Sequence, residues 1–237
     1  MIKGLVVSAA VFVGLAGLAD RGCAALAGSA VGEAIQRSDG LVEKPEVTFR
    51  GFPFVTQAIR GKFDEIDVEA RGVIVDKLTF STIDADLRGV EVGIKDALSG
   101  DIEAVPVRSG TSIVALTYAE LNEFLDSRPG SPRASAGRNG TLLVRSTVGV
   151  PGRGSVPVEG MGVPSVTTGG IVVKVTGIRA VSGPALPATV AAASSGRLSF
   201  TIPTGGMPFG ITVREVSVEA DALRFGATAK GVIIRGR

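Results

Sequence analysis

The sequence is poor in the side chains that most often carry catalysis or hold metals. It contains no histidine among 237 residues, and Cys23 is its only cysteine. Without histidine this chain has no Ser-His-Asp triad, no imidazole metal ligand and no imidazole proton shuttle. A single cysteine excludes an internal disulfide, a Cys-x-x-Cys motif and a thiolate metal cluster. These absences argue against most hydrolases, and we expect no cofactor and no bound metal.

Features of nucleic-acid binding are scarce as well. The sequence has no tryptophan and one tyrosine, which leaves few aromatic platforms for base stacking. Its 25 basic and 23 acidic residues give a net charge of +2, without the basic excess that binds phosphate backbones. We therefore expect no nucleic-acid partner. Apolar residues, in contrast, make up 45% of the chain, enough for a large core and for apolar surface that contacts a ligand or a membrane.

The N-terminus has the pattern of an export signal. Met1-Ile2-Lys3 is followed by an uncharged run from Gly4 to Ala19. As a helix this run would span roughly 24 Å, less than the ~30 Å hydrocarbon core of a bilayer. The pattern predicts a secretory signal over residues 1–27, cleaved after the small-x-small sequence Ala25-Leu26-Ala27. The charged pair Asp20-Arg21 lies between the apolar run and this site, so a retained short signal-anchor is the alternative interpretation.

Residues 28–237 are predicted to form a single β-rich domain. Alternation of apolar and charged side chains over residues 66–71 and 83–88 is typical of half-buried strands. The phase of this alternation flips after Gly89 and again just after Val213, which predicts a β-bulge at each place. Further strands are expected at 141–150, 170–181 and 197–203, with a hairpin turn at 152–154.

Two helices are expected in this chain. The first covers residues 24–37, where small and apolar residues recur at helical spacing. The second begins at a capping box formed by Thr117 and Glu120 and directs its apolar side chains to one face. The stretch 128–140 is rich in Pro, Gly, Ser and Arg, and it is expected to form a mobile loop.

The run from Pro45 to Gln57, PEVTFRGFPFVTQ, resembles the signature of the LmeA-like phospholipid-binding family of the actinobacterial cell envelope. The resemblance covers nearly the whole chain and is most specific at Gly51-Phe52-Pro53-Phe54. It extends to the following elements: Asp20-Arg21, Gly61, Phe63 and Leu87-Arg88-Gly89-Val90. It implies a β-rich α+β fold, in which a long curved antiparallel sheet wraps around one or two helices like a tubular lipid-binding (TULIP-like) half-barrel.

The resemblance also implies a function and a location. The protein would be exported to the periplasm or cell wall and lie at the outer face of the plasma membrane, in peripheral contact with it. It would bind anionic phospholipid, such as phosphatidylinositol, in an apolar groove, and it would support lipoglycan assembly, as mannan elongation is supported in one branch of the family. The family has no established active site, so no catalytic residue and no enzyme activity are expected. The alternative is a non-enzymatic scaffold for cell-envelope polysaccharide enzymes; the sequence identifies no protein partner.

Phe52, Pro53 and Phe54 are candidates for an apolar lip at the mouth of this groove. An exposed apolar turn of this kind would contact acyl chains. The alternative is a rigid turn whose phenylalanines cap the core, because proline fixes the backbone. A similar sequence, Gly206-Met207-Pro208-Phe209, adds Met207 and Phe209 as candidates.

The remaining candidates are inward-facing apolar residues and nearby cations. The groove would be lined by Ile66, Val68, Leu78, Phe80, Leu121, Phe124, Leu125, Val173 and Phe200. Ordinary core packing explains the same pattern, since any strand or helix buries one apolar face. A lipid phosphate would be met by Arg50, Arg60 and Lys62, unless these are solvated charges at strand edges. The acidic pairs Asp67/Glu69 and Asp84/Asp86 alternate regularly with apolar residues, which favours an exposed strand face over a glycosidase-like pair.

Overall fold

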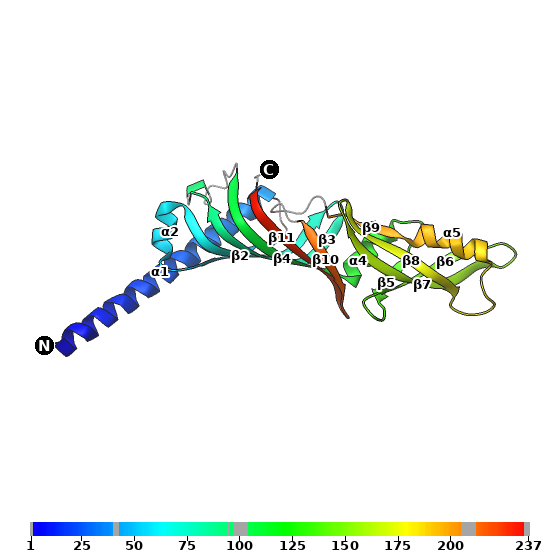
Figure 1. The fold of residues 1–237 in the computed structure, drawn as a ribbon, viewed down its shortest axis with the longest axis horizontal. Helices are drawn as coiled ribbons and strands as arrows, with labels where there is room; N and C mark the ends of the chain where they lie inside the picture. The colour runs from blue at the N-terminus through cyan, green and yellow to red at the C-terminus, as the bar shows by residue number, and fades with distance from the viewer. Residues whose placement is uncertain (1, 40–42, 94, 97–103, 205–211, 235–237) are drawn as a thin grey trace. The chain divides into compact units, whose positions relative to one another are not determined.

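A computed structural model of the chain describes residues 2–39, 43–93, 95–96, 104–204 and 212–234 (Figure 1). In chain order the elements are α1 (Ile2–Asp39), β1 (Glu46–Arg50), α2 (Phe54–Arg60), β2 (Lys62–Val75), β3 (Leu78–Glu91), β4 (Val105–Thr117), α4 (Tyr118–Asp126), β5 (Arg133–Ala136), β6 (Leu142–Val150), β7 (Gly154–Thr167), β8 (Gly170–Ala180), α5 (Ala188–Leu198), β9 (Phe200–Ile202), β10 (Val213–Val218) and β11 (Ala222–Ile234). The strands form two sheets, with orders β1-β2-β3-β4-β11-β10 and β5-β6-β7-β8-β9. The predicted fold class is confirmed: the chain is mostly β, its sheets are antiparallel, and one of them curls into a half-barrel.

The chain divides into two compact units. Unit 1 comprises residues 1–71, 84–111 and 229–237, and unit 2 comprises residues 72–83 and 112–228. Unit 1 contains α1, β1 and α2, while unit 2 contains α4, the sheet β5–β9, α5 and β10. The four long strands β2, β3, β4 and β11 contribute residues to both units.

Unit 1 has a core of aromatic rings beneath its first two strands. Phe49 on β1 pairs with Ile66 on β2, and both side chains are buried. The Phe49 ring lies 5.2 Å from that of Phe54 and 4.9 Å from that of Phe63, measured between centroids. Tilted contacts at these separations stabilise more than the buried area alone. The start of α2 is therefore fixed to the sheet by one of its own aromatic residues.

The helix α1 packs along β1 with its smallest residues. Gly28 and Gly32 approach the β1 side so closely that an added Cβ atom would lie 2.1 Å from the carbonyl oxygen of Val47 and 2.4 Å from that of Pro45. The predicted helix 24–37 lies inside α1, which also includes residues 2–23. Among the residues whose side chains the structure describes, which in α1 are residues 17–37, no helix combines the length and the apolar character needed to cross a bilayer.

Unit 2 is built on the sheet β5–β9 and the helix α5, which packs against β8 and β6 (Figure 1). β9 pairs with β8 only as far as Phe200 opposite Val173. Beyond that point the backbone N–H of Val175 donates to Ser199 Oγ at 3.0 Å, and its carbonyl accepts from Ser195 Oγ. Serine side chains at the end of α5 thus replace the missing strand partner.

The predicted capping box starts α4 as expected. Thr117 Oγ1 accepts a hydrogen bond from the Glu120 backbone N–H at 3.3 Å, and Glu120 Oε2 accepts one from the Thr117 backbone N–H at 2.8 Å. Leu121 and Leu125 are fully buried on one face of the helix. Both predictions, the helix start and its buried face, are confirmed.

Both predicted phase flips are confirmed. β3 continues through Gly89, which has a φ of 60°, and the buried positions change from Ala85 before it to Val90 after it. Between Val213 and Glu215 the register of β10 against β11 shifts. A residue other than glycine at position 89 would be strained in this backbone conformation, and its Cβ would lie 2.9 Å from that of Arg108.

Two predictions of local structure need correction. The stretch 128–140 is not one loop, because β5 (Arg133–Ala136) lies within it and pairs with β6. The strand expected at 197–203 is shorter, because residues 197–198 belong to α5. The sequence predicts neither α2 nor α5, since α2 has only seven residues and the small residues of α5 give no clear apolar periodicity. The turn at 152–154 is confirmed, with Val150 paired to Gly154 across it.

Candidate lipid-contacting surface

The helix α2 begins without a cap of its own. Pro53, at the N-cap position, has an extended backbone and makes no side-chain hydrogen bond to the helix. The peptide bond between Phe52 and Pro53 is cis, and Gly51 before it has a φ of 85°. The first N–H groups of a helix need acceptors, so α2 requires a partner from elsewhere in the chain.

That partner is Asp20, in the middle of α1. Its Oδ2 accepts a hydrogen bond from the Phe54 N–H at 2.9 Å, and its Oδ1 accepts one from the Val55 N–H at 3.0 Å. The hydrogen bond from Val55 lowers the pKa of Asp20 and outweighs its burial, which raises it; Phe54 and the charge of Arg21 lower it further. The positive end of the α2 dipole also stabilises a carboxylate at this position.

Arg21 holds the other side of the same turn. Its Nη2 donates a hydrogen bond to the carbonyl oxygen of Gly51. Its guanidinium carbon lies 6.0 Å from the centroid of the Phe52 ring, within the range of a cation–π contact. Asp20 and Arg21 therefore fix both the turn and the first residues of α2.

This arrangement leaves four apolar residues at the surface. Phe52 is 60% exposed, Val55 44% and Ile59 81%, and Pro53 is exposed as well. Val55 and Ile59 lie one helical turn apart and so share a face of α2. We call these four residues the α2 apolar surface. Exposed apolar groups gathered in this way are typical of contact with a membrane or another partner.

The predicted lip is thus divided between surface and interior. Phe52 and Pro53 are exposed, as an apolar lip requires, whereas Phe54 is 5% exposed and belongs to the aromatic core. Met207 and Phe209, the other lip candidates, lie outside the described residues. Lipid contact by these residues stays a prediction.

The groove candidates are divided between the two units. Ile66 and Val68 are buried in unit 1. The buried candidates in unit 2 are Leu78, Phe80, Leu121, Leu125, Val173 and Phe200. Phe124 is half-buried, with the guanidinium carbon of Arg128 at 5.1 Å from its ring centroid. Their contact with an acyl chain stays a prediction.

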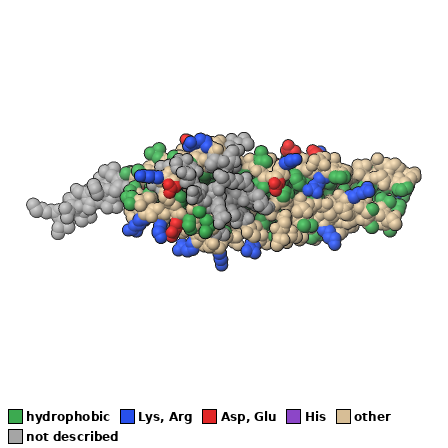
Figure 2. Space-filling model, turned by 90° about the horizontal axis from the view of Figure 1, so that it is seen from above, with side chains coloured by type: hydrophobic (Ala, Val, Ile, Leu, Met, Phe, Trp, Pro, Cys, Tyr) green, Lys and Arg blue, Asp and Glu red, His purple; other side chains and the backbone are tan. Residues whose placement is uncertain are grey.

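The three headgroup candidates differ in their surroundings. Arg50 is paired with Asp67, and that hydrogen bond raises the pKa of Arg50. Lys62 is paired with Glu91 at 2.9 Å. Arg60, at the end of α2, is exposed and has no ion-pair partner among the described residues. Among the described residues on the face seen in Figure 2, Lys and Arg side chains are spread along the molecule, with apolar and acidic side chains between them.

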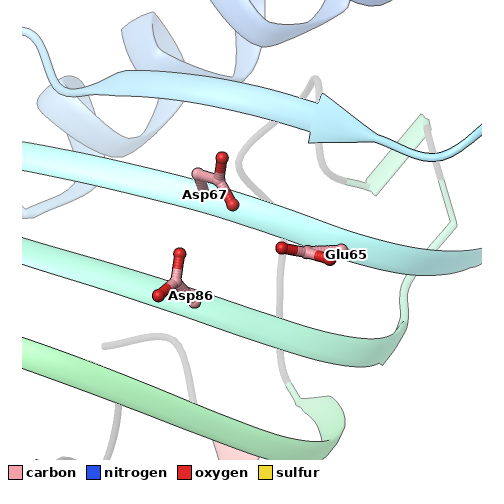
Figure 3. Close-up of side chains that lie close together, drawn as sticks. All are labelled: Glu65, Asp67 and Asp86. Carbon is pink, nitrogen blue, oxygen red and sulfur yellow. The ribbon is translucent and has the colours of Figure 1, made fainter.

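An acidic cluster occupies the polar face of the same unit. Glu65 and Asp67 on β2 and Asp86 on β3 point into one space, with carboxylate oxygens within 4.8 Å of one another (Figure 3). Two of the three carboxylates already pair with arginine: Asp67 with Arg50, and Glu65 with Arg88 at 3.8 Å. This is the charged, outward strand face that the alternation predicts, and its negative charge is partly balanced within the protein.

The sequence did not reveal that Asp20 and Arg21 hold the α2 apolar surface in place. The pair was visible only as an interruption between the apolar run and a possible cleavage site. A cap provided from 35 positions away leaves no local pattern, because capping signals are read within a few residues of the helix start. The one available signal was the presence of an Asp-Arg pair in the family resemblance.

Comparison with known proteins supports the resemblance. The family model described as LmeA-like phospholipid-binding matches residues 18–228. The match includes Asp20, Arg21 and the whole α2 apolar surface. No curated protein and no solved structure matches the chain.

Proposed function

Because the chain belongs to the LmeA-like phospholipid-binding family, we propose that it is an exported protein that binds anionic phospholipid at the outer face of the plasma membrane. The observation that carries this proposal is the α2 apolar surface, in which Phe52 and Ile59 are exposed beside Arg21 and Arg60. Apolar side chains of this kind enter the acyl boundary of a bilayer, while neighbouring arginines meet the phosphates.

Membrane attachment requires both apolar burial and electrostatic attraction to anionic lipid. Burying an apolar side chain the size of isoleucine or phenylalanine stabilises by roughly 1.5–3 kcal/mol, and a basic residue near an anionic surface adds about 1 kcal/mol. One residue alone gives weak, reversible attachment. Phe52, Val55 and Ile59 together with Arg21 and Arg60 supply enough for peripheral binding that depends on anionic lipid.

The acyl chain of a bound lipid is proposed to lie against the apolar interior of the curled sheet. Ile66 and Val68 are buried apolar residues of β2 in unit 1, and we propose that they contact the acyl chain. Mass spectrometry of organic extracts from the purified full-length protein measures this directly. We expect phospholipid in roughly stoichiometric amount, and extracts without lipid after purification from cells would contradict uptake into the interior.

The surface itself is tested with sedimentation of vesicles. Full-length protein in mild detergent is diluted into vesicles of phosphatidylcholine alone or with phosphatidylglycerol or phosphatidylinositol. We expect binding to rise with the fraction of anionic lipid. We expect Ile59→Ser to weaken binding by about tenfold, because the variant no longer buries an isoleucine side chain in the bilayer. Ile74→Ser is the matched control, since Ile74 is also exposed, at 60%, but lies on β2 outside this surface. Equal weakening by both variants, or binding independent of lipid charge, would reject the proposal.

We place this lipid binding in lipoglycan assembly, the process known for one branch of the family. The size distribution of lipoglycans, compared between cells with and without the protein, tests this part separately. An unchanged distribution would remove this role and leave lipid binding untouched.

A further inference from the structure

The helix α1 has one continuous buried face that runs across the predicted cleavage site. The face is made by Asp20, Ala24, Gly28, Val31, Gly32 and Ala34, all of which are buried. These positions recur at helical spacing, so they lie on one side of the helix. Asp20 and Ala24 precede the Ala25-Leu26-Ala27 sequence, and the others follow it. A signal peptide that is cleaved off is not expected to contribute buried residues to the helix face that packs on the mature domain.

The contacts on the N-terminal side of this site are specific ones. Asp20 provides both acceptors for the first N–H groups of α2, and Arg21 binds the carbonyl of Gly51. Cleavage after Ala27 would remove both residues. The N–H groups of Phe54 and Val55 would lose their acceptor at a place where α2 has no cap of its own.

We infer that α1 stays on the mature protein, so that the Ala25-Leu26-Ala27 sequence is not a cleavage site and α1 tethers the domain by its apolar N-terminal part. The tether and the domain are then joined rigidly through Asp20, not by a flexible linker. The partner of the tether is the lipid phase of the membrane; only this placement rests on the function proposed above. The consequence is that the α2 apolar surface, fixed to α1 by Asp20 and Arg21, is held next to the bilayer.

The chain contains its own probe for this inference. Cys23, its only cysteine, is exposed and precedes the predicted cleavage site. The full-length chain with a C-terminal tag is expressed in a secreting bacterial host, and the membrane fraction is analysed by intact mass and by labelling with a maleimide. We expect the uncleaved mass, 24.1 kDa plus the tag, and one maleimide per chain. Cys23→Ser is the labelling control and should take up none.

A variant at the site itself separates retention from slow processing. Ala25→Leu places a large, helix-compatible residue at an exposed position that a small-x-small cleavage sequence requires to be small. We expect wild type and Ala25→Leu to be recovered at full length in the same fraction. A wild-type product that begins at Gly28 and has no thiol, while Ala25→Leu stays intact, would overturn the inference. So would a product cut between the apolar run and Asp20, which keeps the thiol but loses the tether. Vesicle binding by a shortened product would leave the proposed function standing.

Discussion

Asp20 Oδ1 accepts a hydrogen bond from the backbone N–H of Val55 at 3.0 Å, which joins α1 to α2 across 35 positions of the chain. The contact combines two roles. It completes the start of α2, and it fixes the exposed side chain of Val55 in a surface that we propose to face lipid. Stability and membrane contact are therefore expected to depend on one carboxylate.

The first prediction concerns this carboxylate. Asp20→Ala should lower the melting temperature of the full-length protein by a few degrees, because the first N–H groups of α2 lose their acceptor. Asp20→Asn should lose less, since an asparagine side chain also caps a helix. Thermal unfolding followed by circular dichroism measures both. If Asp20→Ala melted like the wild type, the cap would contribute nothing to the fold.

The second prediction is a pH dependence with a defined sign. The pKa of Asp20 in the folded protein lies below its ordinary value of 3.8, so its contribution is complete well above that pH and is lost as the pH falls through 3.8 and below. The melting temperature of the wild type should fall in this acidic range, and that of Asp20→Asn should fall less.

Glu159 must be included in this experiment. Its pKa is also lowered, first by the hydrogen bond from Arg179, so it adds acid sensitivity of the same sign. Asp20→Asn with Glu159→Gln should therefore show a flatter acid profile than either single variant. A single Asp20→Asn profile that matches the wild type would argue against a lowered pKa at Asp20.

The third prediction separates two neighbouring phenylalanines. Phe54→Ala should destabilise the protein by roughly 3–5 kcal/mol, because it removes a buried ring from the aromatic core. Phe52→Ser should leave the free energy of unfolding nearly unchanged and weaken binding to anionic vesicles. Denaturant unfolding and vesicle sedimentation, done on both variants, measure the two effects. Loss of stability in Phe52→Ser would mean that its ring supports the fold.

The fourth prediction distinguishes Arg60 from Arg50 by their effect on vesicle binding. Arg60→Gln should weaken binding to anionic vesicles, and the loss should shrink in high salt, because exposed charges are screened. Arg50→Gln should leave vesicle binding unchanged, since Arg50 is already paired with Asp67. Titration of vesicles at low and high salt provides the comparison. If Arg50→Gln weakened vesicle binding more than Arg60→Gln, the lipid headgroup would contact the polar face of the sheet instead of α2.

The fifth prediction uses two glycines of α1. Gly28→Ala should destabilise the protein, because the new methyl group would lie 2.1 Å from the Val47 carbonyl oxygen. Gly22→Ala meets nothing within 4 Å and should stabilise by roughly 0.5–1 kcal/mol, since alanine favours helix. Thermal unfolding of the two full-length variants measures the contrast. Similar effects of both would show that α1 does not pack on β1.

Several local features of the fold could be predicted from short stretches of the sequence. The capping box at Thr117 and Glu120 and the phase flips at Gly89 and after Val213 depend on neighbours within a few residues, and all are confirmed. The four-residue strand β5 and the helices α2 and α5 were not predicted, because short or small-residue segments have little periodicity of their own. Their positions depend on partners elsewhere in the chain: β6 pairs with β5, and Val175 on β8 donates to Ser199 Oγ and accepts from Ser195 Oγ at the end of α5.

For the candidate site, the sequence alone determined which residues are apolar, which are charged and that the Gly51-Phe52-Pro53-Phe54 block resembles a lipid-binding family. Only the tertiary structure decided that Phe54 turns into the core while Phe52 stays outside, and that Asp20 supplies the cap of α2. The physical reason is that burial and hydrogen-bond partners are set by groups distant in the chain. A sequence pattern records the side chains available for such contacts, whereas the packing of α1 on β1 selects which of them meet.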